Sequence, residues 1–486
     1  MKYLYTAAAL LAATASADLC THGSTDDDGN YYCQKVEAIT YAGVGGEGTY
    51  NKVTSMADGA CTSSPFGYNG SLSPLDEELS LHFRGPLQLK QFAFYAPCTA
   101  ASSYSKEKRN VGRRSAMERR HAHGHGHAHA HLHHAREAHA EEKRAPALGD
   151  MVTAVINGVS ETWKNTYGGN AGAADDAESS SAPSYGAGTT ASTGSSGAAA
   201  PASYGGSSSS TTSSTTSEST TSSSSNDDGD DSSSSGTGWT RQGYYNAESG
   251  TSSGIVFLNH EGGSGSGVFD YSFGNSLSYA SANGQSGASA PTTLENCEIP
   301  SGTEVVIMTD DKCGTDDSSC GYYRDGTVAY HGFDGASKAF FFEFSMPDDG
   351  TTAASKYDPT NMPAIWLLNA QIPRTLQYGN AECSCWTTGC GEFDIFEVLA
   401  PGDARCKSTL HGNIAGGDSD YFARPTSDTI KAALLLYKDN IHIKILPDST
   451  DFGTTMGDSF FSEIVADTME DSVEKLVSLF TLSGSS

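Results

Sequence analysis

The sequence predicts an all-β fold, a concanavalin-like β-sandwich or jelly roll with disordered insertions. Three observations indicate it: apolar residues that alternate with period two, turn-forming residues between these runs, and long segments too low in complexity to form a core. Phe340, Phe342 and Phe344 show the alternation most clearly, so we expect their side chains on one face of a strand. The 486-residue chain is therefore expected to contain less globular structure than its length would allow.

Most of the sandwich is expected between residues 237 and 450. The apolar run 305–308 is typical of a buried strand. A second run at 434–437 and alternating isoleucines in 441–446 flank a Lys438-Asp439-Asn440 turn, which predicts a hairpin. Little strand-like sequence follows, so a complete sandwich needs strands from elsewhere in the chain.

The N-terminal region 18–105 is predicted to supply those strands. In segment 79–84 the odd-numbered residues are apolar and the even-numbered residues are polar, as in a half-buried strand. Residues 87–95 form a second strand-like run. Strands donated from the N-terminal part to a sheet of the C-terminal part would amount to a circular permutation, and we expect one here.

Two further segments are predicted to be helical. Residues 150–169 form a short ordered patch with apolar periodicity, interpreted as a small helix. The tail 451–486 is predicted to contain an amphipathic helix with four apolar side chains on one side: Met469, Val473, Val477 and Phe480.

The N-terminus resembles a secretory signal peptide over residues 1–17. An apolar stretch leads to Ala15-Ser16-Ala17, a small-residue cleavage site before Asp18. No segment reaches the length of about 18 apolar residues that spans a membrane as a helix, and the last residues lack the hydrophobic tail of a GPI signal. We therefore expect a secreted protein without a transmembrane segment.

Two insertions are expected to be disordered. Residues 106–149 contain a histidine run bracketed by dibasic pairs such as Lys143-Arg144, a natural site for a processing protease. The histidines could bind a transition metal, but a processed spacer is the favoured interpretation, and no metal or other cofactor is predicted. Residues 170–236 form a Ser/Thr/Gly-rich linker.

Charge and cysteines narrow the function further. The net charge of −29 disfavours nucleic acid and anionic membranes as partners, whereas a neutral polysaccharide is compatible with it. In a secreted protein the eleven cysteines are expected to form disulfides and to leave at least one thiol unpaired. Cys383, Cys385 and Cys390 precede the most acidic strand, and bridges there are favoured over a zinc site.

That strand, Glu392-Phe393-Asp394-Ile395-Phe396-Glu397, is the most informative segment of the chain. Glu392 and Asp394 share a face of a strand, whereas Glu397 should point away unless a β-bulge adds one residue. With the bulge, two glutamates flank Asp394, and carboxyl groups about 5–5.5 Å apart suit a retaining glycosidase. A calcium site and a solvated edge strand are the alternatives.

Neighbouring motifs carry a family resemblance. Pro363-Ala364-Ile365-Trp366-Leu367-Leu368 and the approach Trp386-Thr387-Thr388-Gly389-Cys390-Gly391 resemble glycoside hydrolase family 16. Together with segments 79–87 and 420–433, they resemble more closely a fungal cell-wall family, the target-of-SBF-type proteins, regarded as circularly permuted 1,3-β-glucanases. The resemblance implies Glu392 as nucleophile, Asp394 as its helper and Glu397 as acid/base.

Several other residues are candidates for the site. Trp366, Trp386 and Tyr378 could contact a sugar through their aromatic faces. Core packing explains Trp366 equally well, whereas the groove is favoured for Trp386, which leads into the acidic strand. His411 could bond a sugar or Glu392, or it could be a structural histidine. Asn69, in Asn69-Gly70-Ser71, is a candidate N-glycosylation site.

Three functions fit these residues. The leading one is hydrolysis of internal β-1,3-glucan linkages in the cell wall, with retention of configuration. The second is transglycosylation, which uses the same intermediate with a sugar acceptor. The third is a non-catalytic, glucan-binding wall protein.

Overall fold

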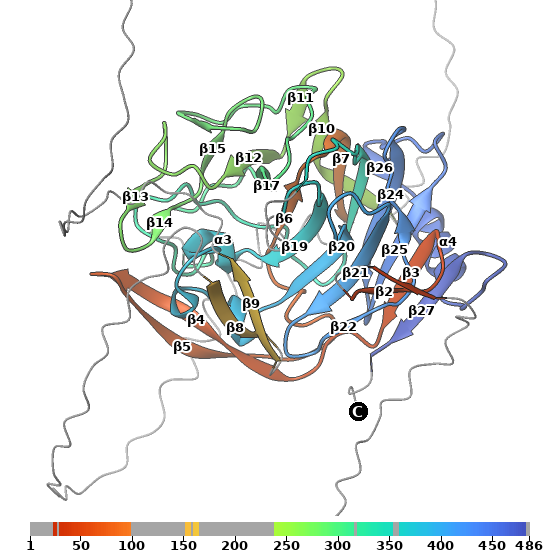
Figure 1. Ribbon diagram of the computed structural model, residues 1–486, viewed down its shortest axis with the longest axis horizontal. Helices are drawn as coiled ribbons and strands as arrows, with labels where there is room; N and C mark the ends of the chain where they lie inside the picture. The colour runs from red at the N-terminus through yellow and green to blue at the C-terminus, as the bar shows by residue number, and fades with distance from the viewer. Residues whose placement is uncertain are drawn as a thin grey trace, which may run out of the picture. The chain divides into compact units, whose positions relative to one another are not determined.

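Alternating apolar residues build two large β-sheets in the computed structural model of the chain (Figure 1). The structure describes residues 23–26, 29–98, 238–314, 318–352 and 359–482, with strands at 151–156 and 159–164. The signal segment 1–17, the basic segment 106–149 with Lys143-Arg144, and the linker 170–236 lie outside the described residues. All described residues fall in one compact unit.

The first sheet has nine strands. In spatial order they are β11 (Thr251–Ser253), β10 (Trp239–Asn246), β7 (Gln88–Pro97), β18 (Lys338–Ser345), β24 (Ile430–Tyr437), β25 (Asn440–Leu446), β3 (Ala38–Ala42) and β27 (Val477–Thr481), with β26 (Thr455–Met456) beside β10.

The second sheet has ten strands and carries the acidic segment. In order they are β16 (Gly287–Ala288), β15 (Ser278–Ala280), β12 (Ile255–Asn259), β17 (Glu304–Thr309), β6 (Leu79–Arg84), β19 (Ala364–Asn369), β20 (Glu392–Glu397), β21 (Arg405–His411) and β22 (Gly416–Gly417), with β23 (Phe422–Ala423) beside β21.

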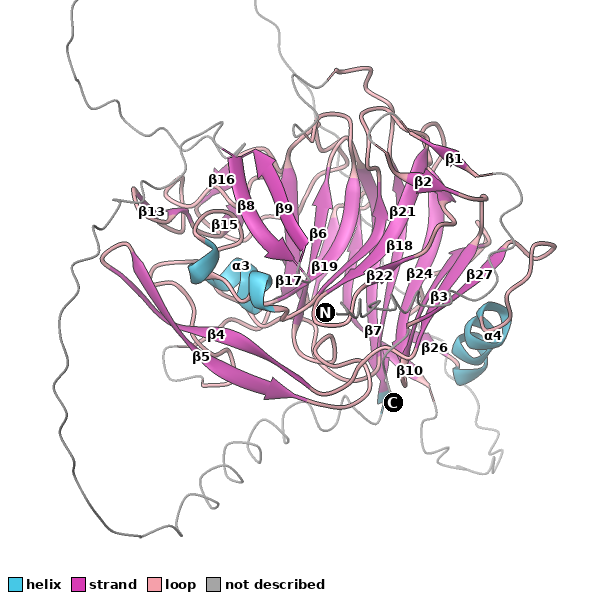
Figure 2. Cartoon of the chain, turned by 60° about the horizontal axis from the view of Figure 1, so that its bottom comes forward, coloured by secondary structure: helices cyan, strands magenta, loops and turns pink. Residues whose placement is uncertain are grey.

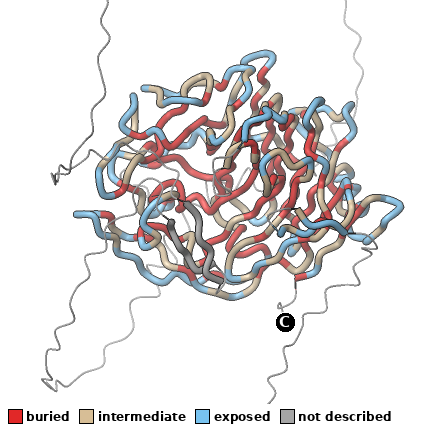
Figure 3. The backbone as a smooth tube through the Cα atoms, viewed as in Figure 1, coloured by how far each residue is buried: buried red, intermediate tan, exposed pale blue. Residues whose placement is uncertain are grey.

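The main core lies between these two sheets, so the predicted β-sandwich is confirmed (Figure 2). Phe342 on β18 meets Phe83 on β6 with ring centroids 6.3 Å apart. Phe344 meets Phe396 on β20 at 5.2 Å. The backbone of these central strands is buried, as the red tube in Figure 3 shows. The period-two alternation thus delivers one apolar face of each sheet to the same interior.

Strands of the N-terminal part complete both sheets, as the circular permutation requires. β6 lies between β17 and β19, β7 lies between β10 and β18, and β3 lies between β25 and β27. In Figure 1 these strands, red and orange, stand among green and blue ones. The N-terminal region is therefore not a separate domain.

The C-terminal tail differs from its prediction. The helix α4 (Asp458–Thr468) ends early, and its Phe461 and Ile464 pack on the outer face of the nine-stranded sheet. Val477 and Phe480 lie on strand β27, which pairs in parallel with β3. The free edge of β3 offers unpaired backbone groups, and these outweigh the weak helical periodicity of the tail.

The patch at 150–169 also differs from its prediction. It contains two paired strands, β8 (Met151–Ile156) and β9 (Val159–Lys164), in place of a small helix. β-branched residues are frequent in both segments, and an Asn-Gly pair, a strong hairpin signal, stands between them in the sequence.

Smaller elements surround the sheets. They are the hairpin β4 (Gly48–Ala57) and β5 (Ala60–Tyr68), the pairs β1 (Ser24–Thr25) with β2 (Tyr31–Tyr32) and β13 (Phe269–Asp270) with β14 (Gly274–Asn275), the helix α3 (Gln371–Thr375), and the 3₁₀ turns η2 (Ala381–Cys383) and η3 (Trp386–Thr388). No helix among the described residues is long and apolar enough to cross a membrane.

Candidate active site

A bulge in strand β20 gathers the three acids on one face of the ten-stranded sheet. Against β19, the pairing register moves by one residue between Ile365 and Trp366. Against β21, it moves between Asp394 and Glu397. The predicted bulge is therefore confirmed, and Glu392, Asp394 and Glu397 all point away from the core.

The apolar residues of the same strand explain why the acids cannot turn inward. Phe393, Ile395 and Phe396 are fully buried between the two sheets. A slip by one residue would exchange these side chains with carboxylates in an apolar core, at a high cost in desolvation. The strand's own composition therefore holds the acids on the outer face.

Neighbouring strands add side chains directly beside the acids. Residues directly opposite one another in antiparallel strands have Cβ atoms about 5 Å apart. The three cross-strand rows are Ser80, Leu368, Glu392 and His411; His82, Trp366, Asp394 and Thr409; and Arg84, Ala364, Glu397 and Lys407.

Trp386 holds the first glutamate. Its indole Nε1 donates a hydrogen bond of 2.8 Å to Oε2 of Glu392, from the η3 turn directly ahead of β20. The ring is only partly buried. The structure therefore places Trp386 beside the acids, as the sequence analysis favoured.

His411 pairs with the central aspartate. Its Nε2 lies 3.0 Å from Oδ2 of the buried Asp394, although its nearest backbone partner is Glu392. Burial alone would lower the pKa of His411, but the hydrogen bond and charge of Asp394 outweigh burial and raise this pKa to about 10. Of the alternatives that the sequence leaves open for His411, the structure places it facing the carboxylates, with Asp394 rather than Glu392 as its partner.

Arg84 contacts the second glutamate, Glu397, and this contact was not predicted from the sequence. Its Nη2 lies 3.4 Å from Oε1 of Glu397, and its Nε donates to the carbonyl oxygen of Met362 at 2.8 Å. The alternation in segment 79–84 had put Arg84 on the polar face of its strand. The sequence could not show which strand would lie beside it.

The electrostatics of the site favour bound protons. Burial, followed by the negative charge of Asp394, raises the pKa of both Glu392 and Glu397 above the ordinary range of a carboxyl group. The indole of Trp386 and the guanidinium of Arg84 oppose this rise at their own glutamates. The set can therefore keep a proton near neutral pH, which an acid catalyst requires.

Trp366 lies on the acidic face and not in the core between the sheets. It stands across from Asp394 on one side and His82 on the other. The imidazole of His82 stacks on its ring at 5.2 Å with an angle of 26° between the planes. Only 4% of Trp366 is exposed, so most of its surface is covered within this layer.

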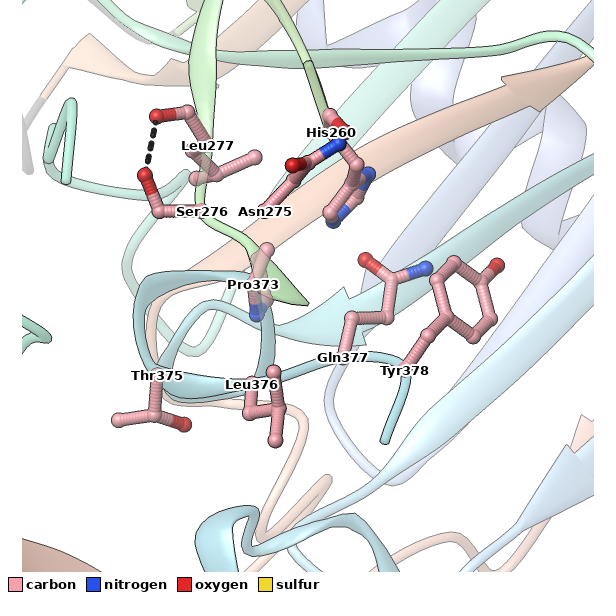
Figure 4. Close-up of a pocket in the computed structure, with 9 residues that line it drawn as sticks. All are labelled: His260, Asn275, Ser276, Leu277, Pro373, Thr375, Leu376, Gln377 and Tyr378. Atoms are coloured by element: carbon pink, nitrogen blue, oxygen red, sulfur yellow. Dashed lines mark hydrogen bonds between the residues drawn. The ribbon is translucent and has the colours of Figure 1, made fainter. Parts of the chain in front are cut away.

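Tyr378 lies in the loop after α3, beside a small hollow (Figure 4). Its hydroxyl donates to Oε2 of Glu304 at 2.7 Å, and its ring meets the edge of Trp386 at 6.2 Å. The hollow is lined by His260, Asn275, Ser276, Leu277, Pro373, Thr375, Leu376, Gln377 and Tyr378. Figure 4 shows Gln377 and Tyr378 facing His260 across it.

Two disulfides brace the approach to β20. Cys385 is bonded to Cys390 within the loop, and Cys383 is bonded to Cys61 on the β4–β5 hairpin. The expectation of bridges around this loop is confirmed. The glycine after Cys390, Gly391, has φ +105°, and a Cβ there would lie 2.9 Å from Leu75. The positive φ favours glycine at this position, and the close approach to Leu75 leaves little room for a side chain.

The remaining described cysteines are either bonded or free, and Cys33 is among the disulfide-bonded ones. Cys313 is bonded to Cys320, with His331 close to the sulfur of Cys320. This group resembles a metal-ligand set in composition, but the bond between the sulfurs occupies both thiolates. Among the described residues Cys98, Cys297 and Cys406 are free thiols.

Asn69 is accessible to modification. It is exposed just after the end of β5, in the turn Asn69-Gly70-Ser71. Glycosylation there remains a prediction.

The comparisons with known proteins agree with the chain's architecture. Residues 37–97 and 237–464 match the models described as the N-terminal and C-terminal parts of cell wall protein YJL171C/Tos1. Over 471 residues, the chain is 44% identical to "Probable circularly permuted 1,3-beta-glucanase TOS1" of Candida albicans, covering 92% of this chain and 93% of the other. The chain belongs to the Tos1 family of cell wall proteins.

Further relatives carry similar names. The TOS1 protein of Saccharomyces cerevisiae is 40% identical over 90% of this chain and 91% of its own length. A protein of Arthroderma benhamiae, also named a probable circularly permuted 1,3-beta-glucanase, is 38% identical over 93% and 94%. These names support the circular permutation. No solved structure matches the chain.

Proposed function

We propose that this chain is a secreted cell-wall glycosidase that cleaves internal linkages of 1,3-β-glucan with retention of configuration. One observation carries the proposal: the β20 bulge that brings Glu392, Asp394 and Glu397 onto one face. Retaining glycosidases need two carboxyl groups on one side of the scissile bond, close enough for one to attack while the other donates a proton.

The contacts of the acids support distinct roles. Glu392 accepts a short bond from the Trp386 indole, which favours the carboxylate that a nucleophile needs. Arg84 lies farther from Glu397, at 3.4 Å. We assign the acid/base role to Glu397, as the family resemblance implies for its position. Without substrate, burial and the charge of Asp394 raise the pKa of both glutamates, and more at Glu392, so the assignment requires Glu392 to ionise when the substrate is bound. Asp394, paired with His411, separates the two glutamates and raises the pKa of both.

The surroundings support a sugar substrate. The partly exposed rings of Trp386 and Tyr378 lie beside the acids, and aromatic faces are common partners of sugar rings. Trp366 is 4% exposed and stacked against His82, so its ring is not available to a sugar. A net charge of −29 is compatible with a neutral polymer. The names of the relatives supply the linkage, 1,3-β-glucan.

Secretion is part of the proposal. Residues 1–17 have the composition of a signal peptide. Mass spectrometry of the protein from culture medium or cell wall should identify Asp18 as the first residue. An N-terminus that retains residues 1–17 would contradict it.

The catalytic test uses laminarin, with mixed-linkage glucan as a specificity control. Glu397→Gln should lower kcat by about 10²–10⁴-fold, the usual contribution of general acid–base catalysis. Glu392→Gln should lower kcat at least as much, because no covalent intermediate can form without the nucleophile. Glu382→Gln, at an exposed glutamate in the preceding turn, is the matched control and should keep wild-type activity. Activity that survives both site substitutions would refute the mechanism.

The products decide between the competing functions. Shorter chains with retained anomeric configuration, followed by NMR, would support hydrolysis. Chains longer than the substrate would identify a transglycosylase. Binding to insoluble glucan without turnover would identify a glucan-binding wall protein.

A further inference from the structure

A fourth carboxylate, Glu304, lies on the same face of the sheet as the three acids, with strands β6 and β19 between it and β20. It begins strand β17, where it stands opposite Arg84 of β6. Three donors converge on it: Nδ1 of His82 at 2.7 Å, the Tyr378 hydroxyl at 2.7 Å and Nε2 of Gln377 at 2.9 Å. Its side chain is only 12% exposed. A buried carboxylate with three donors is a rigid anchor, since each donor is fixed by a charge-assisted bond.

One line of contacts runs from Glu304 to Asp394. Glu304 holds Nδ1 of His82, and Nε2 of the same ring is 2.7 Å from Oγ of Ser80. Both nitrogens are therefore engaged, so the ring cannot rotate freely. It stacks on Trp366, which stands directly across from Asp394.

A second line runs from Glu304 to Glu392. The anchored Tyr378 presents its ring to the edge of Trp386. Trp386 in turn donates its indole N–H to Glu392. A shift of Tyr378 would therefore change the surroundings of the residue that holds the proposed nucleophile.

We propose that Glu304 is a positioning residue, which holds Trp366 through His82 and Trp386 through Tyr378 so that the acids of β20 keep their geometry. The inference rests on the proposed function, because the reaction is what the geometry serves. Two residues separate Glu304 from an acid along each line: His82 and Trp366 on the way to Asp394, and Tyr378 and Trp386 on the way to Glu392. Glu304 therefore does not take part in the chemistry itself.

Glu304→Gln tests the charge and the acceptor without changing the shape of the side chain. The amide replaces one acceptor oxygen with a donating NH₂ group, so it cannot accept from all three donors. At least one of the two lines of contacts therefore loses its charge-assisted acceptor. Glu298→Gln, at an exposed glutamate six residues earlier, is the matched control.

The kinetic readout separates positioning from substrate binding and from folding. We expect Glu304→Gln to lower kcat on laminarin by about 10- to 100-fold, with KM within about twofold. This is the usual effect of losing a residue that orients the groups in contact with the substrate. Melting curves select temperatures at which the variant is folded. A folded variant with kcat within twofold of wild type would overturn the proposal, as would a loss confined to KM.

A second readout does not depend on turnover. In a spectrum of ¹⁵N-labelled tryptophan, the indole N–H signal of Trp386 can be assigned by its loss in Trp386→Phe. We expect this signal to shift in Glu304→Gln and in Tyr378→Phe, but not in Glu298→Gln. An unchanged signal in both variants would overturn the line through Tyr378.

Tyr378→Phe keeps the test decisive if Glu304→Gln does not fold, because it removes one donor and leaves the carboxylate in place. The two failures remain distinguishable. A wild-type protein that turns over no glucan would refute the proposed function, and the indole signal would still decide whether Glu304 positions Trp386.

Discussion

The indole nitrogen of Trp386 donates a 2.8 Å hydrogen bond to Glu392, six residues further along the chain. The 3₁₀ turn η3 and the Cys385–Cys390 bridge shape the loop that connects them. A donor at this distance stabilises the carboxylate of Glu392 relative to its protonated form. The residue that leads into the strand therefore lowers the pKa of the strand's first acid, against burial and the charge of Asp394, which raise it.

Replacing Trp386 with Phe should impair the ionisation of Glu392. Without the N–H donor the pKa of Glu392 rises further, so the acidic limb of the pH profile of kcat should move to higher pH. We expect kcat at the wild-type optimum to fall by about 10-fold, the effect of a bond worth roughly 1.4 kcal/mol. Tyr271→Phe, at an exposed ring, is the control and should leave the pH profile unchanged.

An unmoved acidic limb in Trp386→Phe would contradict the assignment of Glu392 as the ionised group.

The ion pair of His411 and Asp394 should make stability depend on pH. The pKa of His411 is raised from its usual 6.5 to about 10, so its contribution to folding is complete below pH 6.5 and is lost as the pH rises through 10. The gap in Tm between wild type and His411→Gln should therefore shrink between pH 6.5 and pH 10.

Melting curves of both proteins over this range provide the measurement. Lys475→Gln, at an exposed surface ion pair, is the control and should show no such change in Tm with pH. A gap that stays constant or widens with pH would contradict the ion pair.

Cleavage at Lys143-Arg144 should leave two chains that stay together. Cys61 in the N-terminal part is bonded to Cys383 in the C-terminal part, and strands of both parts alternate in both sheets. Protein cleaved there should run as one band on a non-reducing gel and as two bands after reduction.

Under native conditions the reduced sample should also remain one particle, because β6 and β7 stay paired on both sides. Two bands on the non-reducing gel would contradict the link through Cys61.

The contact between the two parts of the chain should carry a large share of the stability. Phe83 on β6 is fully buried and meets Phe342 of the opposite sheet. Phe83→Ala should lower the free energy of unfolding by about 3–5 kcal/mol, the usual cost of a large core deletion. Denaturant titration provides the measurement, and Phe269→Ala, at a ring that is 38% exposed, should change it by less than about 1 kcal/mol.

The acidic strand was predictable because its information is local. Alternation assigns each side chain of a strand to a face, and Phe393, Ile395 and Phe396 cannot all be buried unless an extra residue is accommodated. The bulge therefore follows from the order of the residues in β20.

The partners of the acids were not predictable in the same way. Arg84 lies 313 residues before Glu397 in the chain, and Glu304 lies 88 residues before Glu392. Nothing in the segments of Arg84 and Glu304 indicates which strand will lie beside them. The sequence leaves His411 open between a place at the acids and a structural role, and its pairing with Asp394 depends on the directions of side chains on two paired strands. The tail contains a helix as predicted, but at Asp458–Thr468. Residues 477–481 were wrongly placed on that helix for the same reason, since only the free edge of β3 makes them a strand.

By itself, the sequence determined the all-β fold, the faces of the strands, the three acids and their bulge, because periodicity and apolar burial act over a few neighbouring residues. Tertiary structure alone decided strand order, and with it which charges meet: Arg84 with Glu397, His411 with Asp394, and the donors that gather on Glu304. Hydrogen bonds and ion pairs act over about 3 Å, so they depend on which distant segments the fold brings together.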